Sequence, residues 1–224
     1  MRIFRCYMPQ TMVTDKIRSI IQLGWMSYKN KVASELVEPE NEKMMQLQLA
    51  QILQNIIPLF EYNQSESIKV LLEVPVVLLK NSQKRIIDIV ILHSDSDTKT
   101  FFPIEIKCFR EYTRDKTAKR GAQNLGMYDY WEDIENLEHY TKLPNFSFGT
   151  HLTLTDDGYY VNVRHRGRQV VVYSTNRTRE NVSGLLSEPI KNRKGKIELR
   201  GNYSMNTWEL KGSFNFINQE IGIL

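Results

Sequence analysis

Two runs of apolar, largely β-branched residues stand close together near the middle of the chain, at 85–92 and 101–108, and a polar stretch separates them at 93–99. Apolar runs of this length joined by a polar link predict a β-hairpin whose strands are buried on both faces. Charged residues nevertheless interrupt both runs, with Asp88 in the first and Glu105 and Lys107 in the second. Because an unpaired charge is very unfavourable inside a buried strand, these three side chains are expected to have partners.

Strand geometry predicts that the three charges meet. Side chains alternate along a strand with a period of two, so Glu105 and Lys107 project from the same face. If Asp88 lies beside them across the hairpin, two carboxylates and one ammonium gather at one point. Such a group is suited to hold a divalent cation and a water molecule.

Helical spacing precedes the hairpin. The segment 40–57 predicts a helix that Pro58 ends, with its apolar stripe at Met45, Leu49, Leu53 and Ile56. Glu42 falls on this stripe one turn before Met45, so it is expected to point toward the core. It is either a further acid of the site or a first-turn acid favoured by the helix dipole, and Glu38 and Glu40 are alternatives for the first role.

Other segments predict the surrounding elements. The segment 68–79 predicts a strand in which Pro75 favours an edge position or a bulge. A long helix is predicted over 114–137, with Arg120 and Gln123 on one of its faces. Short strands are predicted at 151–155, 159–163 and 169–173, and basic turns at 164–168 and 191–196.

Asp88 followed by Glu105-Ile106-Lys107 resembles the motif of the PD-(D/E)XK nuclease superfamily, in which an Asp on one strand precedes Glu/Asp-x-Lys on the next. Ile87 stands where the motif name has Pro, a residue that binds no metal. The resemblance implies an α/β, restriction-endonuclease-like fold, with a mixed central sheet flanked by helices and additional C-terminal strands. Its motifs cover residues 40–135 within one domain of residues 1–224, which ends in a β-rich extension at 148–224.

The same resemblance implies roles for individual residues. Asp88, Glu105 and the main-chain carbonyl of Ile106 would coordinate Mg²⁺ or Mn²⁺, since hard cations select oxygen ligands. Lys107 would orient or help deprotonate the attacking water, with a pKa lowered by the metal and by burial. Glu42 would complete the site.

Contacts with nucleic acid are expected from basic residues and amides. Arg120 and Gln123 would hold oxygens of the scissile phosphate. A basic loop would follow the phosphate backbone through Arg164, Arg166 and Arg168, although a solvated loop is the alternative interpretation.

Composition narrows the remaining classes. The 224 residues carry a net charge of +4, and two cysteines and four histidines show no disulfide framework or zinc-ligand spacing. No signal peptide, membrane span, P-loop, dinucleotide-binding or nucleophile-elbow motif is apparent. We therefore expect a cytoplasmic, Mg²⁺-dependent endonuclease without membrane association, with DNA as the favoured substrate and a homodimer as an allowed assembly. The alternatives are a catalytically inactive nucleic-acid-binding protein and an interaction domain with a structural Asp/Glu/Lys network.

Overall fold

The chain forms a mixed α/β protein around a six-stranded sheet, as seen in a computed structural model that describes residues 10–78, 82–96, 98–162 and 171–222. The strand order is β1-β2-β3-β4-β8-β7. The bounds are β1 (Glu66–Val77), β2 (Lys84–Asp95), β3 (Thr98–Phe109), β4 (Gly149–Thr155), β7 (Glu209–Lys211) and β8 (Phe214–Ile221). A separate two-stranded sheet pairs β5 (Val182–Ser187) with β6 (Lys196–Tyr203).

The sheet is mixed because one of its pairs is parallel. Strands β1, β2 and β3 pair antiparallel, and so do β4, β8 and β7. The β3–β4 pair is parallel, and helix α3 (Gln123–Tyr140) lies in the connection between these strands. A parallel pair needs such a crossover, whereas a tight turn suffices for a hairpin.

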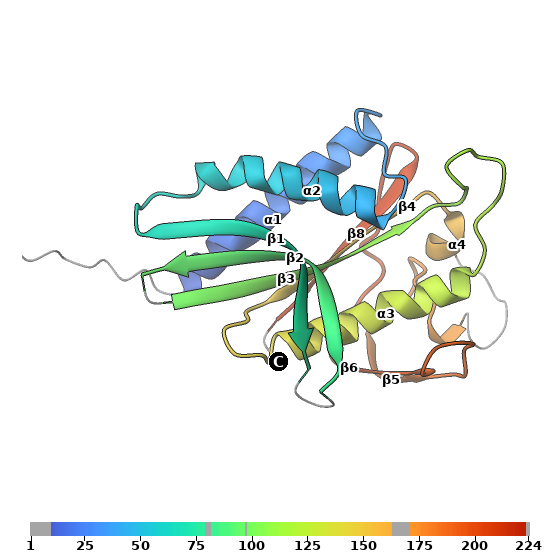
Figure 1. Ribbon diagram of the computed structural model, residues 1–224. Helices are drawn as coiled ribbons and strands as arrows, with labels where there is room; N and C mark the ends of the chain where they lie inside the picture. The colour runs from blue at the N-terminus through green and yellow to red at the C-terminus, as the bar shows by residue number, and fades with distance from the viewer. Residues whose placement is uncertain (1–9, 79–81, 97, 163–170, 223–224) are drawn as a thin grey trace, which may run out of the picture.

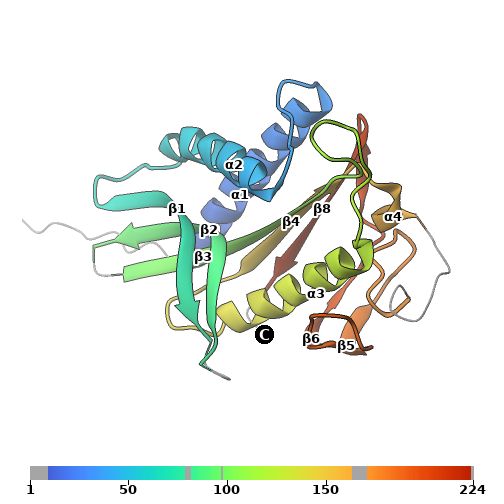
Figure 2. The same ribbon diagram turned by 45° about the vertical axis from the view of Figure 1, so that its right-hand side comes forward.

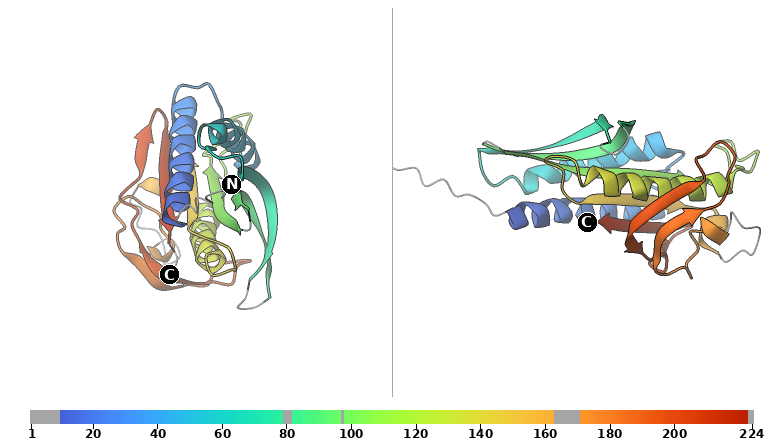
Figure 3. Two further views of the ribbon diagram at one scale, coloured as in Figure 1. Left: turned by 90° about the vertical axis from the view of Figure 1, so that its left-hand side faces the viewer. Right: turned by 90° about the horizontal axis from the view of Figure 1, so that it is seen from below.

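Helices cover both faces of the sheet. Helices α1 (Gln10–Ala33) and α2 (Glu42–Ile56) bury their apolar side chains on one face, together with residues such as Ile104 and Ile106 of β3. Helix α3 packs on the other face, and β5 and β6 lie alongside it (Figures 2 and 3). The middle of β3 therefore lies between two helical layers.

Strands β1 and β2 bend together away from β3, as Figure 1 shows. The β2–β3 ladder stops at the pair Ile89–Ile104, while the β1–β2 ladder continues to Val77–Lys84. Glu73 has φ 54°, a left-handed conformation that interrupts a regular strand. The edge of β3 beyond Ile104 is consequently free of β2.

Three predicted elements are confirmed. The hairpin is present with a shorter link than expected, because β2 runs to Asp95 and β3 begins at Thr98. Helix α2 begins after Asn41, whose side chain accepts a hydrogen bond from the Met44 amide, and Pro58 lies in the 3₁₀ turn Ile57–Leu59 that follows it. Strand β1 is an edge strand.

The predicted helix over 114–137 is wrong over its first nine residues, since α3 begins at Gln123. The Asp115 carboxylate accepts hydrogen bonds from both the amide and the hydroxyl of Thr117 and from the hydroxyl of Thr113. Such local bonds compete with helical ones. Lys116 and Ala122 also have positive φ, so residues 114–122 form a loop and Arg120 is not on a helix.

The C-terminal third is only partly as predicted. Strand β4 is confirmed, but the strand predicted at 159–163 is wrong because Gly158–Val161 forms the short helix α4, capped by the Asp157 side chain. In the strand predicted at 169–173, residues 169 and 170 lie outside the described residues, and Val171 and Val172 are helical instead of extended. Helix α1 lies outside the predicted elements, although its buried residues follow helical spacing. No helix in the described ranges is both long and apolar enough to cross a membrane.

Candidate functional site

The free edge of β3 brings the predicted triad together. Where β2 leaves β3, the Asp88 carboxylate takes the place of the missing ladder, and its Oδ2 accepts a hydrogen bond of 3.0 Å from the Ile106 amide. The last β2–β3 pair is Ile89–Ile104, and Asp88 and Glu105 are the next residues beyond this pair at the end where the ladder stops. The prediction that these charges lie on adjacent strands is confirmed.

Glu105 and Lys107 share one face, also as predicted. Ile104, Ile106 and Cys108 belong to the core beneath α1 and α2, so the alternating Glu105 and Lys107 face α3. Cys108 is a buried residue on the strand face opposite Lys107. The Ile106 carbonyl lies on the same side of β3 as its amide, because both groups of a strand residue point toward the same neighbour. It therefore faces Asp88.

A buried glutamine holds the bend in place. The Gln46 side chain of α2 is 5% exposed, and its Nε2 donates to the Asp88 carbonyl at 2.6 Å and to Glu73 Oε1 at 2.7 Å. The β1–β2 register passes from Leu72–Ile89 to Val74–Ile87 and leaves Asp88 without a partner on β1, so the Gln46 amide supplies a donor for its carbonyl. The position of Asp88 is thus fixed from α2 as well as from β3.

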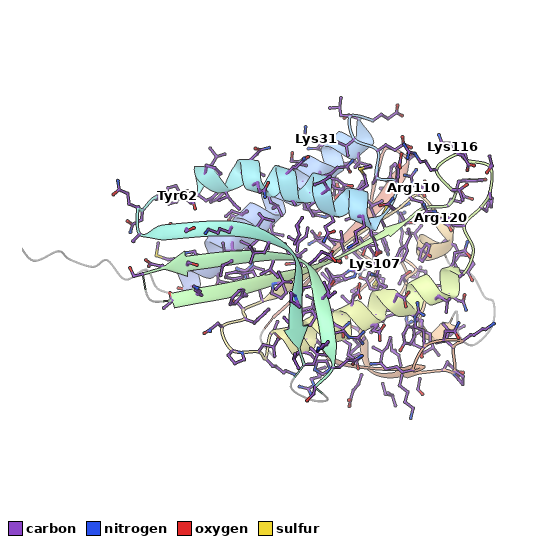
Figure 4. The ribbon with its side chains drawn as sticks, in the orientation of Figure 1. Lys31, Tyr62, Lys107, Arg110, Lys116 and Arg120 are labelled. Atoms are coloured by element: carbon purple, nitrogen blue, oxygen red, sulfur yellow. The ribbon has the colours of Figure 1, made fainter. Side chains whose placement is uncertain are left out.

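Lys107 lies between two acids that come from different layers. Its Nζ is 2.8 Å from Asp133 Oδ2 of α3 and 3.5 Å from Glu42 Oε2, at the first residue of α2. Figure 4 shows Lys107 beside the bend, between α2 and α3. Glu42 therefore lies at the site, as one of its two interpretations predicts.

The carboxyl groups of the site change one another's ionisation. The pKa of Glu105 is raised well above its usual range by burial and then by the nearby Asp133 and Asp88, and a hydrogen bond to Asp88 adds to this shift. Burial also raises the pKa of Glu42. Raised pKa values in neighbouring buried carboxyls indicate an excess of negative charge.

The expected lowering of the Lys107 pKa depends on a bound metal as well as on burial, so it stays a prediction for the metal-bound protein. Burial alone lowers this pKa, but Asp133 and Glu42 outweigh it, so the pKa of Lys107 is raised. The same attraction leaves the pKa of Asp133 lowered although burial opposes this. Lys107 is consequently an ammonium group at neutral pH.

Asp133 and His151 belong to the site but were not among the predicted residues. His151 lies beside Glu105 in the parallel β3–β4 register, and its Nε2 is 3.6 Å from Asp133 Oδ2. Asp133 follows Tyr130 by three residues, so it shares the buried stripe of α3, and that spacing was an available signal. Nothing in the sequence indicates the parallel pairing that places His151 here.

The oxygen atoms of this site fit a hard divalent cation. Asp88 and Glu105 supply carboxylate oxygens from adjacent strands, and the Ile106 carbonyl faces the side on which Asp88 lies. Among the described residues, no three His, Cys, Asp or Glu side chains are already grouped as metal ligands. A cation would therefore rest on two carboxylates, a carbonyl and water, with Glu42 nearby.

Arg120 and Gln123 have structural contacts instead of a shared helical face. Arg120 donates from Nη2 to the Glu40 carbonyl at 3.0 Å and from Nε to the Tyr112 carbonyl. Gln123 donates to the Arg120 carbonyl and to Asp157. Ten residues of helix, about 15 Å, separate Gln123 from Asp133. Figure 4 places Arg120 on the loop side of Lys107.

The two basic turns have different outcomes. Arg164, Arg166 and Arg168 lie outside the described residues. In the turn at 191–196, Arg193 forms a two-point ion pair with Asp129 at 2.5 and 2.7 Å, and Lys194 pairs with Glu135. This turn is bound to α3, so these two charges are already partnered.

Searches of protein-family models, curated proteins and solved structures find no match to this chain.

Proposed function

We propose that this protein is a nuclease of the PD-(D/E)XK type that hydrolyses phosphodiester bonds with Mg²⁺ or Mn²⁺. The observation that carries the proposal is the bend of β2, which sets Asp88 beside Glu105 and leaves Lys107 two residues further along the free edge of β3. Burial, Asp133 and Asp88 raise the pKa of Glu105 there. A divalent cation would offset the negative charge of the carboxylates and remove the repulsion between them.

Each residue has a distinct role in this proposal. Asp88, Glu105 and the Ile106 carbonyl would hold the cation, and Glu42 would accept a water ligand or bind directly. The bound cation would polarise the scissile phosphate and lower the pKa of the attacking water. Lys107, an ammonium group, would orient that water and stabilise the negative charge that develops on the phosphate oxygens.

The wider setting is also proposed. DNA is the favoured substrate, the protein would act in the cytoplasm, and a homodimer would allow cleavage of both strands of a duplex.

Melting temperature and cleavage together test the function. Purified wild-type protein would be melted with and without Mg²⁺, Mn²⁺ or Ca²⁺, and assayed in Mn²⁺ against plasmid, linear duplex, single-stranded DNA and RNA. A specific site raises the melting temperature by mass action, and Glu105→Gln should remove that response together with cleavage. Cleavage that survives in Glu105→Gln would refute the metal assignment.

A structural ion network is the second candidate, because Lys107 is paired on both sides by Asp133 and Glu42. Such networks also shift pKa values. This candidate predicts no cation-dependent change in melting temperature and no cleavage of any substrate. A protein that responds to cations and binds DNA without cutting it would instead be the inactive nucleic-acid-binding form.

A further inference from the structure

The position of the Lys107 ammonium depends on its anchors. A lysine side chain is a flexible four-carbon stem that carries a point charge, so the contacts of Nζ decide where the charge lies. Two carboxylates contact it, Asp133 at 2.8 Å and Glu42 at 3.5 Å. The Asp-Glu-Lys motif includes neither of them.

The two anchors differ in how firmly they are held. The Asp133 side chain is 15% exposed in the middle of α3, whereas that of Glu42 is 41% exposed at the first residue of α2. Helix ends fray, and helix interiors packed on a sheet do not. Glu42 is therefore the anchor free to turn toward a cation at Asp88 and Glu105, and Asp133 is the one that stays.

His151 lies on β4, next to Asp133. Its ring is fully buried and packs edge-on against Tyr130 at 4.5 Å between ring centres. Thr153 Oγ1 lies 3.1 Å from Nδ1, and donation from this hydroxyl leaves the ring proton on Nε2. Within the described residues Nε2 has no hydrogen-bond partner, and it lies 3.6 Å from Asp133 Oδ2. A buried donor in this state is unfavourable, so closing that gap is favoured.

The register between β3 and β4 places His151 and Thr153 next to the charged residues of the motif. In the parallel β3–β4 ladder, His151 lies beside Glu105 and Thr153 beside Lys107. The two motif residues on β3 therefore have as neighbours on β4 the histidine next to Asp133 and the threonine that contacts this histidine.

We propose that Asp133, held by His151, is a positioning residue that fixes the Lys107 ammonium at the reacting phosphate. This inference rests on the proposed nuclease function. A charge held in place before the reaction stabilises the transition state without reorganisation, and a displacement of about 1 Å is enough to lower turnover about 100-fold.

Steady-state cleavage of plasmid DNA in Mn²⁺ tests the inference. Asp133→Asn keeps the shape of the side chain and removes its charge, so kcat should fall about 100-fold while KM changes less than about threefold. The rise in melting temperature with Mn²⁺ should persist, because Asp88 and Glu105 are untouched. Asp133→Glu restores the charge and should recover about tenfold of the lost kcat, and His151→Gln should lose about tenfold.

Glu132→Gln is the matched control, because it removes the neighbouring charge on α3 and its ion pair with Arg85 but touches no site residue. Its kcat should equal that of the wild type. If Asp133→Asn does not fold, Asp133→Glu and His151→Gln decide the outcome by the same criterion, a lower kcat at a nearly unchanged KM.

The two proposals fail in different ways. A wild-type enzyme that cleaves, with unchanged kcat in folded Asp133→Asn and only a lower melting temperature, would overturn the positioning role and leave the nuclease intact. A wild type that cleaves none of the substrates would overturn both.

Discussion

Helix α3 carries buried carboxylates in two opposite situations. Glu138, 1% exposed, accepts hydrogen bonds from the amides of Arg200 and Gly201 and from the hydroxyl of Tyr203, at 2.7–2.9 Å. Asp133, on the same helix, lies in a group whose carboxyls outnumber its ammonium, with Glu42, Asp88, Glu105 and Asp133 around Lys107.

The two carboxylates differ in what surrounds them: Glu138 has neutral donors, and Asp133 lies among other carboxyls. The amides that donate to Glu138 are neutral groups on the edge of β6. Their hydrogen bonds satisfy the buried carboxylate and also attach the two-stranded sheet to α3. At Lys107, burial and then the neighbouring Asp133 and Asp88 raise the pKa of Glu105. Excess charge of one sign in a buried place is unfavourable unless a cation completes it.

The largest expected effect is on chemistry. Glu105→Gln should lower cleavage about 1000-fold or more, because the variant loses a cation ligand and not merely a contact. Lys107→Ala should be equally inactive but should keep the cation-dependent rise in melting temperature. Glu138→Gln, measured beside them, should cleave normally per folded molecule. Equal losses of cleavage in Glu105→Gln and Glu138→Gln would contradict the proposed difference between the two carboxylates.

The reverse ranking is expected for stability. Glu138→Gln weakens three charge-assisted hydrogen bonds and should lower the free energy of unfolding by about 2–4 kcal/mol. Tyr203→Phe removes one of them and should cost about 1–2 kcal/mol. Urea unfolding monitored by tryptophan fluorescence gives both values, and a neutral result for Glu138→Gln would show that Glu138 does not attach the β5–β6 sheet.

A pH series sharpens the comparison further. Because the folded-state pKa of Glu105 is raised, its contribution to stability is fully present below its unfolded pKa and is lost as the pH rises through the folded value. Without cations, Glu105→Gln should therefore gain melting temperature relative to the wild type at pH 8 and lose that advantage near pH 4. A constant difference between the two proteins across this range would contradict the assigned shift.

The smallest effect is expected at the turn 191–196. Arg193→Ala removes a partly exposed ion pair with Asp129 and should cost about 0–1 kcal/mol. It should leave the salt dependence of DNA binding in Ca²⁺ unchanged, since its charge is already neutralised. Replacing Arg164, Arg166 and Arg168 with alanine should flatten that dependence if the loop follows the phosphate backbone. A matching change in Arg193→Ala would show that the turn leaves α3 to bind DNA.

The prediction of α2 and of the hairpin succeeded because both depend on local pattern. The stripe from Met45 to Ile56 and the stop at Pro58 define a helix without reference to other segments. The prediction of a helix over 114–122 also failed for a local reason. Hydrogen bonds from Thr113 and Thr117 to Asp115 compete with the helical hydrogen bonds of this segment.

The sequence by itself determined that Asp88, Glu105 and Lys107 lie in apolar strands of one hairpin and that Glu105 and Lys107 share a face, because strand periodicity is a short-range property. The tertiary structure alone decided that β1 and β2 bend at Glu73, that β3 pairs parallel with β4, and that Asp133 and His151 lie beside Lys107. These features come from segments far apart in the chain, and their pairing depends on the packing of α3 between the sheet and β6. No local pattern encodes that packing.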